Sequence, residues 1–193
     1  MFHGLGDTHC QIKTTLNKAL FRFVYNRVEI NNAASSWQLL TVVTMKDEYW
    51  MKKALALACK AEAAGEVPVG AVLVKGDELI AEGWNQPISS HDATSHAEIM
   101  AMREAGIKLN NYRLIDTTMY VTLEPCSMCV GAMIHARVAK VVYGASEPRT
   151  GALGGAFNLL EANQHNHVFE IVPGVLAEDS KMMLQDFFQS RRK

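Results

Sequence analysis

The sequence predicts an α/β fold in which helices cover both faces of a mixed β-sheet. Three observations lead to this prediction: an amphipathic helix at 47–65, a β-hairpin at 69–85, and helices that then alternate with strands to the end of the chain. Such alternation is typical of sheets that are buried on both sides. The composition, 49% hydrophobic and 20% charged over 193 residues, suits one domain with a short appendage.

The first helix and the hairpin have clear boundaries. Apolar residues recur at helical spacing through 47–65, and Gly65 ends the helix. The hairpin at 69–85 consists of two apolar strands that meet at the turn Gly76–Asp77. The sheet is therefore expected to begin with an antiparallel pair.

The second helix is predicted at 95–106. Ser95 is its expected N-cap and Gly106 its expected stop, because small hydroxyl residues favour helix starts and glycine favours helix ends. The remaining elements follow from the same signals. They are a strand at 117–123, a helix at 126–136, strands at 139–145 and 167–172, and a closing helix at 175–193.

The first 45 residues differ from the rest of the chain. They contain the run NNAASS and apolar stretches without a clean period, whereas the pattern sharpens directly after Met45. We therefore divide the chain into an N-terminal extension, residues 1–45, and a domain at 46–193. The extension is expected to be disordered or to lie upstream of the true start, with Met45 as an alternative first residue.

The composition excludes several classes of function. No apolar run approaches the roughly 20 residues that cross a bilayer, and the N-terminus does not resemble a secretory signal. Among four cysteines only Cys126 and Cys129 are close together, which argues against a disulfide scaffold and favours a reducing compartment, the cytoplasm. Because the net charge is −1, a nucleic acid would have to bind at a local basic patch.

The stretch PCSMC at 125–129 allows three interpretations. A CxxC pair at the start of a helix is compatible with a redox dithiol, because the positive end of the helix stabilises a thiolate. It is equally compatible with half of a structural zinc site or with part of a catalytic metal site. The pair alone does not separate these possibilities.

His96 and Glu98 favour the catalytic metal site. His96 stands at the start of a predicted helix, as do Cys126 and Cys129, and we expect the two helices to emerge from neighbouring strands at the same edge of the sheet. One imidazole and two thiolates form a zinc shell that leaves a position for water, which is typical of catalytic rather than structural sites. Glu98 would then lie close enough to exchange protons with that water.

Two motifs and several longer stretches resemble a known family. HAE at 96–98 together with PCSMC at 125–129 resembles the signature of the zinc-dependent cytidine/deoxycytidylate deaminase superfamily. Within it, residues 47–192 resemble the bacterial tRNA-specific adenosine deaminases, in the stretches EVPVGAVLV, GWN, HAEIMAMR, NYRLIDTTMYVTLEPCSMCVGAMIHARV, VVYGA and DFFQSRR. The resemblance covers nearly the whole core and implies a three-layer α/β/α cytidine-deaminase-like fold around a five-stranded mixed sheet.

The resemblance implies a hydrolase that converts adenosine to inosine at wobble position 34 of a tRNA anticodon and releases ammonia. One Zn²⁺ per subunit would be held by His96, Cys126 and Cys129. Glu98 would be the proton donor and acceptor. The family is homodimeric, and the small and apolar residues VGAMIHA at 130–136 fit a helix packed against a partner or against the sheet.

The resemblance also assigns residues to the RNA. Asn85 matches the residue that hydrogen-bonds the flipped base, and Val67 matches an apolar wall of its pocket. Arg191 and Arg192 match a basic end that contacts the anticodon loop, and Arg149 stands where the family has a lysine. Each also has a simpler interpretation as a turn former, a core residue or a solvated charge. Lys193 extends the basic end, and weaker candidates are Lys52, Lys53, Arg137 and Lys140.

One loop departs from the family pattern. The family carries an aspartate after the fourth strand that contacts the nucleotide before the target, whereas this chain has Glu147 followed by Pro148. Glutamate keeps the charge but is one methylene longer, and proline stiffens the loop. We still expect Glu147 to contact the substrate.

Other functions remain as alternatives to a tRNA deaminase. A deaminase of a free base or nucleoside, of the guanine or cytosine type, would use the same zinc site and would need no basic terminus. A zinc-stabilised binding module would need four protein ligands. A dithiol oxidoreductase would form a disulfide between Cys126 and Cys129 and bind no stoichiometric metal.

Overall fold

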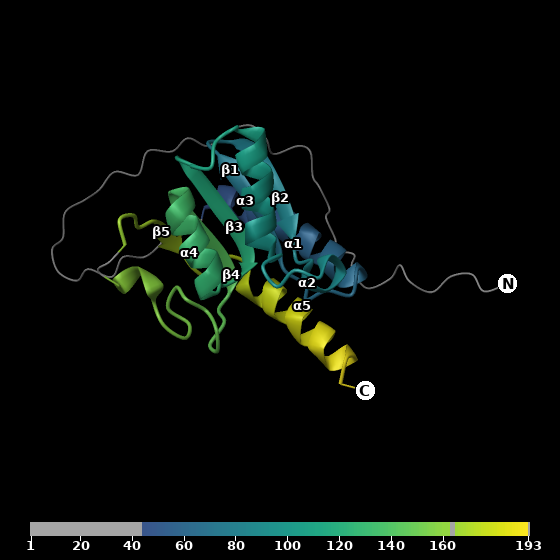
Figure 1. Ribbon diagram of the computed structural model, residues 1–193. Helices are drawn as coiled ribbons and strands as arrows, with labels where there is room; N and C mark the ends of the chain where they lie inside the picture. Colours follow the sequence, from purple (N-terminus) through teal and green to yellow (C-terminus); the bar gives the residue numbers. More distant parts are fainter. Residues whose placement is uncertain (1–43, 163–164, 193) are drawn as a thin grey trace, which may run out of the picture. The chain divides into compact units, whose positions relative to one another are not determined.

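The computed structural model describes residues 44–162 and 165–192 of the chain. The predicted N-terminal extension lies outside these residues, except for Thr44 and Met45. The described part is an α/β domain built on one five-stranded sheet (Figure 1). None of its helices combines the length and the apolar composition that a bilayer crossing requires.

The sheet is mixed, as the sequence predicts. Its strand order is β2-β1-β3-β4-β5, where β1 pairs antiparallel with both β2 and β3, and β3, β4 and β5 run parallel. The strands are β1 (Gly70–Lys75), β2 (Glu78–Trp84), β3 (Thr117–Leu123), β4 (Lys140–Ala145) and β5 (Glu170–Val172). The last strand is shorter than the predicted 167–172, because its partner β4 begins only at Lys140, opposite Glu170.

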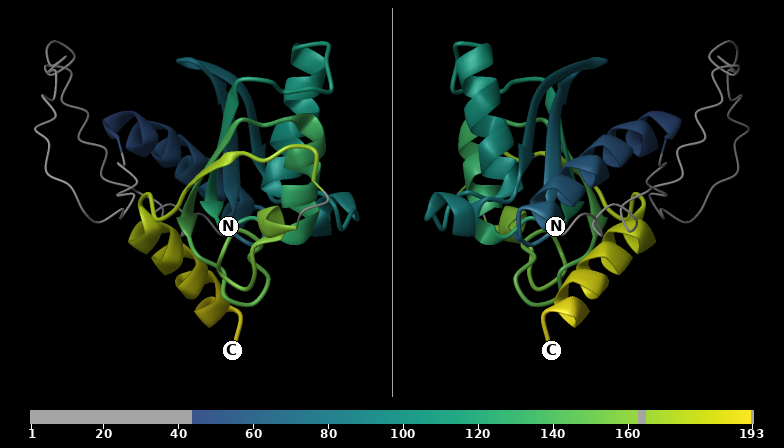
Figure 2. Two further views of the ribbon diagram at one scale, coloured as in Figure 1. Left: turned by 90° about the vertical axis from the view of Figure 1, so that its left-hand side faces the viewer. Right: turned by 90° about the vertical axis from the view of Figure 1, so that its right-hand side faces the viewer.

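Helices cover both faces of the sheet and form the predicted three layers (Figure 2). One face carries α1 and α5, and the other carries α3 and α4. The helices are α1 (Met45–Ala63), α2 (Pro87–Ser90), α3 (Ala97–Lys108), α4 (Ser127–Ala136) and α5 (Ala177–Ser190), with a 3-10 turn, η1 (Leu159–Glu161), between β4 and β5.

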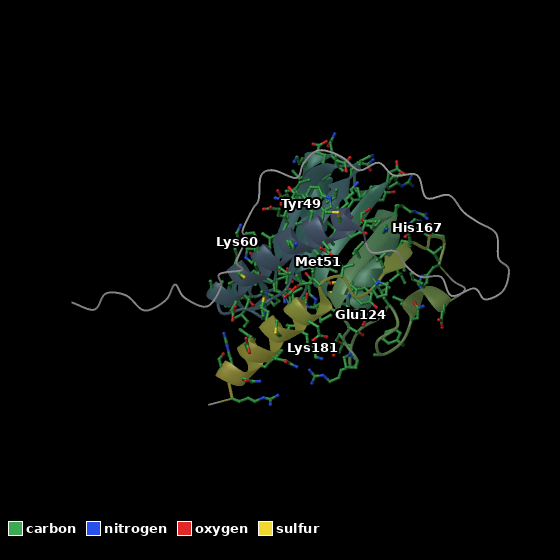
Figure 3. All side chains as sticks on the ribbon, turned by 180° about the vertical axis from the view of Figure 1, so that it is seen from behind. Tyr49, Met51, Lys60, Glu124, His167 and Lys181 are labelled. Carbon is green, nitrogen blue, oxygen red and sulfur yellow. The ribbon has the colours of Figure 1, made fainter. Side chains whose placement is uncertain are left out.

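The central strand β1 supplies side chains to both cores, because successive side chains alternate across a strand. Ala71 and Leu73 pack under α3 and α4, whereas Val72 and Val74 pack with Met51 of α1. All five are at most 1% exposed. Figure 3 shows the face covered by α1 and α5, with Met51 labelled.

A capping box fixes the start of α1. The Thr44 hydroxyl accepts a hydrogen bond from the N–H of Asp47, and the Asp47 carboxylate accepts from the N–H and hydroxyl of Thr44. The Tyr120 hydroxyl of β3 donates to the same carboxylate over 3.0 Å. The first helix is therefore attached to the sheet by a buried polar contact on the α1 face.

Both predicted ends of the second helix are wrong by a short distance. The N-cap of α3 is His96, because the Ser95 hydroxyl donates instead to Asp92 over 3.0 Å. At the other end the helix continues through Gly106 to Lys108. A glycine inside a helix costs only about 1 kcal/mol, and the chain leaves the helix at Asn110 instead, whose φ of 49° is left-handed.

The helices that carry the candidate metal ligands start at one edge of the sheet. β2 and β3 run in the same direction because each pairs antiparallel with β1. α3 follows β2 through α2, and α4 follows β3 almost directly, so both helices begin beyond the carboxyl ends of these strands. The two strands are not neighbours, contrary to expectation, because β1 lies between them. We call the edge where β2, β3 and β4 end the site edge.

Candidate metal centre and substrate groove

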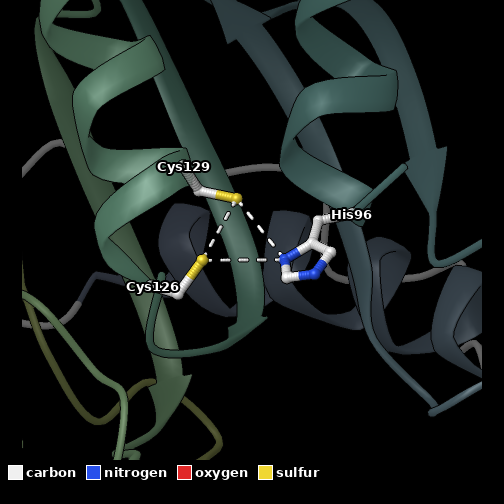
Figure 4. A group of neighbouring side chains, drawn as sticks. All are labelled: His96, Cys126 and Cys129. Carbon is white, nitrogen blue, oxygen red and sulfur yellow. Dashed lines mark hydrogen bonds between the residues drawn. The ribbon is translucent and has the colours of Figure 1, made fainter. Parts of the chain in front are cut away.

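Three side chains meet at the site edge (Figure 4). His96 Nδ1 lies 3.7 Å from Cys126 Sγ and 3.6 Å from Cys129 Sγ, and the two sulfur atoms are 3.8 Å apart. Within residues 44–162 and 165–192, no Asp or Glu joins this group of possible metal ligands. The structure thus brings together the three side chains that the sequence predicts as a metal shell.

The local sequence explains why these side chains converge. His96 is the N-cap of α3 and Cys126 is the N-cap of α4, and neither side chain caps its own helix. Cys129 lies three residues later, in the first turn of α4, so it faces the same side as Cys126. Pro125 leads into this turn with a fixed φ and without an N–H. The positive ends of both helices are therefore directed at the sulfur atoms.

The spacing of the three atoms fits a tetrahedral zinc ion. With Zn–S near 2.3 Å and Zn–N near 2.0–2.1 Å, a tetrahedral ion separates two sulfur ligands by about 3.8 Å and a sulfur from a nitrogen by about 3.5 Å. The observed separations agree to within about 0.2 Å. His96, Cys126 and Cys129 therefore have both the chemistry and the geometry of three zinc ligands.

The two thiols are not equivalent. Hydrogen bonds from the Cys129 thiol and from the His96 ring hold the pKa of Cys126 at about 4. Contact with the Cys126 thiolate, together with burial, raises the pKa of Cys129. The pair therefore shares one proton at neutral pH, and a divalent cation would displace that proton, because metal-bound cysteines are thiolates.

Glu98 is a buried carboxylate beside this group. Its side chain is 3% exposed, and its Oε2 has no hydrogen-bond partner among the described residues. Burial raises the pKa of its carboxyl above the ordinary value. Buried polar atoms without a partner are rare in folded proteins, and this one lies where a proton carrier for the metal site is expected.

Asn85 connects the end of β2 to the candidate ligand on α3. Its Oδ1 accepts the N–H of Ala97 over 2.9 Å, so Asn85 caps α3 from outside the helix. The residue is 8% exposed, and this bond leaves its Nδ2 as a donor. The resemblance assigns Asn85 to the base, but no sequence signal indicates its hydrogen bond to Ala97, the residue that follows His96.

A groove of about 540 Å³ lies at the site edge, between the end of β4 and α5. Val67, Glu147, Arg149 and Arg192 line it, four of the residues that the resemblance assigns to the substrate. The Glu147 carboxylate accepts the N–H of Arg149 over 2.9 Å and is 20% exposed, whereas the Arg149 side chain is 84% exposed. The loop therefore holds its acid close to the backbone and presents its cation to solution.

Arg191 does not line this groove. Its guanidinium donates to the carbonyl oxygen of Gly65 over 2.5 Å and lies 4.7 Å from the centre of the Phe187 ring. Arg191 thus connects the end of α5 to the loop after α1, whereas the adjacent Arg192 faces the groove. Arg191 and Arg192 were both predicted to contact the anticodon loop, but their surroundings differ.

The weaker basic candidates do not line the groove either. Each of the four contacts another part of the domain: Lys52 contacts Glu48, Lys140 contacts Glu170, Arg137 contacts the carbonyl oxygen of Asn166, and Lys53 contacts the ring of Tyr49. Lys193 lies outside the described residues.

The sequence-based prediction missed one whole side of the groove. Residues of α5 form that side: Lys181, Leu184, Gln185, Phe188 and Gln189. They recur every three or four positions and lead to Arg192, which is the spacing of one helix face. That periodicity, together with a basic residue at each end, was a signal that could have revealed them.

The sequence of the domain matches a known superfamily. Residues 44–145 match the sequence profile of the cytidine and deoxycytidylate deaminase zinc-binding region. Together with the five-stranded sheet and the His-Cys-Cys group, this match defines the class: the chain belongs to the superfamily that carries the cytidine and deoxycytidylate deaminase zinc-binding region.

Curated relatives define the family within this class. The tRNA-specific adenosine deaminase of Haemophilus influenzae is 51% identical over 148 residues, which cover 76% of this chain and 86% of that protein. The tRNA-specific adenosine deaminase of Bacillus subtilis is 47% identical over 148 residues, which cover 77% of this chain and 92% of that protein. The chain therefore belongs to the family of tRNA-specific adenosine deaminases.

Solved structures agree with the predicted fold. A structure from work on A-to-I editing by tRNA:A34 deaminases at the wobble position has a TM-score of 0.67 at 36% identity, covering 70% of this chain and 99% of that chain. A guanine deaminase from Nitrosomonas europaea has a TM-score of 0.62 at 27% identity, covering 72% of this chain and 83% of that chain. The cytidine-deaminase-like fold is therefore confirmed.

Proposed function

We propose that this protein hydrolyses adenosine at wobble position 34 of tRNA anticodons to inosine and releases ammonia. The observation that carries the proposal is the buried carboxylate of Glu98, whose Oε2 has no hydrogen-bond partner among the described residues, beside three atoms spaced as zinc ligands. The close relatives that are tRNA-specific adenosine deaminases point to adenosine in tRNA as the substrate. The reaction consumes one water, so the exocyclic amine leaves as ammonia and oxygen takes its place.

His96, Cys126 and Cys129 would hold one Zn²⁺ per subunit. When bound, such an ion lowers the pKa of a coordinated water to about 7. Glu98 would accept a proton of the attacking water at Oε2 and deliver it to the ring nitrogen of the base. It would then take a second proton from the oxygen added to the base and deliver that one to the departing amine. Its burial suits this work, because a carboxyl with a raised pKa holds a proton more readily near neutral pH.

Asn85 and Val67 would position the base. The Oδ1 of Asn85 is engaged by the N–H of Ala97, which orients the amide and leaves Nδ2 to donate to an acceptor on the base. Val67 lines the groove and would form an apolar wall. Because Asn85 also caps α3, one side chain would align the base with His96.

The groove would receive the nucleotides beside the target. Arg149, Arg192 and Lys181 bring positive charge to it, and Phe188 offers a ring on which a base could stack. Glu147 would contact a nucleotide next to the target through the carboxylate oxygen that its bond to Arg149 leaves free. A flipped anticodon loop fits such a site better than an intact duplex, because its bases are unstacked.

A surface of α3 and α4 that shares no residue with the groove would form a homodimer interface. Apolar side chains from both helices and the following loop line a shallow surface there, and Ile107 is 83% and Tyr112 is 70% exposed. Exposed apolar patches of this kind commonly bind another protein surface. Sedimentation of the wild type and of Ile107→Glu tests this, because the charge should shift the protein toward the monomer.

We also propose that the enzyme acts in the cytoplasm, where a reducing environment keeps Cys126 and Cys129 as metal ligands. The catalytic unit would be the domain at 46–193. A shortened protein is best begun at Thr44, because Thr44 caps α1. Equal turnover by the shortened and full chains would support this boundary.

The test is deamination of an anticodon stem-loop with adenosine at position 34, by the wild type and by Glu98→Ala. We expect Glu98→Ala to keep its zinc and to lose about 10²–10⁴-fold in turnover. Full activity of Glu98→Ala, or its loss together with the zinc, would contradict the assigned role.

The alternative is a deaminase of a free base. The likeness to a guanine deaminase of the same fold favours it to a lesser degree. Ammonia release from guanine, adenosine and cytidine, compared with the stem-loop, separates the two functions. Turnover of free bases alone would overturn the tRNA proposal.

A further inference from the structure

Glu124 is a second buried carboxylate at the site edge. It directly follows β3 and is 3% exposed. Among the described residues no cation pairs with it. Four neutral donors surround it instead: the Ser146 hydroxyl at 2.8 Å and the Glu147 N–H at 2.9 Å from Oε2, and the N–H groups of Leu153 at 3.0 Å and Gly155 at 2.8 Å from Oε1.

All four donors belong to one segment, residues 146–155, which we call the clamped loop. Oε2 binds the start of this loop and Oε1 binds its end, so a single carboxylate closes it. Gly151 and Gly155 lie against the carboxylate, and a Cβ at either position would overlap Glu124. The loop and the carboxylate therefore fit each other closely, and only glycine fits at these two contacts.

The clamped loop also contacts the turn that carries the candidate metal ligands. The N–H of Ala152 donates to the carbonyl oxygen of Pro125 over 2.9 Å, and Gly151 forms an isolated β-bridge with Cys126. On its other side the loop supplies Ser146, Glu147 and Arg149 to the groove. The loop is thus the connection between the metal centre and one wall of the groove.

We propose that Glu124 is a positioning residue that fixes the clamped loop against the metal-binding turn and so sets the affinity for RNA. This inference rests on the proposed function and deepens it. Glu124 does not touch the reacting base. It acts through Glu147 and Arg149, which belong to the loop that it holds and which line the groove.

The four donors explain why a carboxylate is needed here. Each oxygen accepts two hydrogen bonds, and every partner is a donor. A glutamine of the same shape would place an NH₂ group opposite two of those donors and leave them unpaired. Glu124→Gln therefore releases one end of the loop with almost no change in volume.

The experiment uses the full-length, zinc-loaded protein and compares Glu124→Gln with the wild type. We expect KM for the stem-loop to rise about tenfold or more, as loss of two charge-assisted hydrogen bonds allows, while kcat stays within about threefold. Zinc content should stay at one per subunit. Hydrogen exchange at the amides of residues 147–155 should accelerate by about tenfold or more, because the loop opens locally.

Tyr120→Phe is the matched control. It removes the buried hydrogen bond to Asp47 on the α1 face and should lower Tm without changing KM or exchange in the clamped loop. If Glu124→Gln fails to fold, Glu124→Asp replaces it. Aspartate keeps the charge but is too short to reach both ends of the loop, so a smaller rise of KM and of exchange is expected.

An unchanged KM with unchanged loop exchange in a folded Glu124 variant would overturn the proposal. The proposal would also be overturned if the Glu124 variant had a lowered Tm but the same KM as Tyr120→Phe, since Glu124 would then be a structural residue only. If the wild type does not deaminate the stem-loop, the proposed function fails. The exchange measurement then still decides whether Glu124 closes the loop, because it does not depend on activity.

Discussion

Glu98 and Glu124 are buried to the same degree but have opposite surroundings. Each side chain is 3% exposed. Glu98 keeps an oxygen without a hydrogen-bond partner among the described residues, whereas both oxygens of Glu124 are fully engaged by the clamped loop. Burial of an ionisable group without partners is costly, so it is kept where chemistry needs it. Glu98 therefore has an oxygen available for proton transfer, whereas the carboxylate of Glu124 holds the clamped loop in place.

The largest expected effect comes from removing a candidate metal ligand, since the proton transfer that we propose for Glu98 requires the metal. Cys129→Ser should abolish stem-loop deamination and lower bound zinc well below one per subunit, because a hydroxyl is a much weaker zinc ligand than a thiolate. Metal analysis together with the ammonia assay checks this. Ser127→Ala, between the two cysteines, is the control and should keep its zinc. Full activity of metal-free Cys129→Ser would contradict the account.

Exchanging the two carboxylates for amides compares them directly. Glu98→Gln should lower kcat by about 10²–10⁴-fold, because an amide cannot accept and return a proton. Glu124→Gln should act mainly on KM. Steady-state kinetics on one stem-loop measure both variants, and equal kcat losses would remove the distinction between them.

The two adjacent arginines provide a smaller and different test. Arg192→Ala should weaken RNA binding and reduce the salt dependence of log K by about 0.7, the value for one phosphate contact on a single strand. Arg191→Ala should leave this slope unchanged and lower Tm, because Arg191 bonds to Gly65 and packs on Phe187. Binding titrations at several salt concentrations measure the slopes. A larger slope change in Arg191→Ala would reverse these roles.

The smallest expected effect is at Glu147. Glu147→Asp should change substrate affinity by less than about tenfold, because the charge remains and only the reach is shorter. The kcat should not fall as it does in Glu98→Gln, since the proposed role of the loop is to position RNA and not to transfer protons. Parallel kinetics of the two variants check this, and a comparable loss of kcat would show that the clamped loop takes part in the chemistry.

The group of three possible metal ligands was predictable from the sequence because the position of each ligand in its own helix is local and the residue types suit zinc. His96, Cys126 and Cys129 each lie at the start of a helix, and helix starts follow from short-range signals. The fold class was equally accessible, because alternating helices and strands leave few arrangements of a mixed sheet. The ends of α3 were misjudged at Ser95, whose hydroxyl bonds to Asp92, and at Gly106, because the left-handed residue that follows the helix is Asn110.

The surroundings of Glu124 and Arg191 were not predictable. The donors to Glu124 lie 22 to 31 residues further along the chain, in a loop without periodicity. Arg191 and Arg192 are chemically identical and adjacent, and only the path of α5 past Gly65 distinguishes them. Both cases depend on long-range contacts, which residue spacing does not encode.

The proposed proton transfer by Glu98 is tested most directly by measuring the single-turnover rate of Glu98→Gln. The measurement uses saturating stem-loop and protein whose zinc content is known. We expect Glu98→Gln to bind one zinc per subunit, to bind RNA normally and to react at a rate about 10²–10⁴-fold below that of the wild type. A wild-type rate with zinc in place would contradict this role, because the buried carboxylate of Glu98 would then have no part in the reaction.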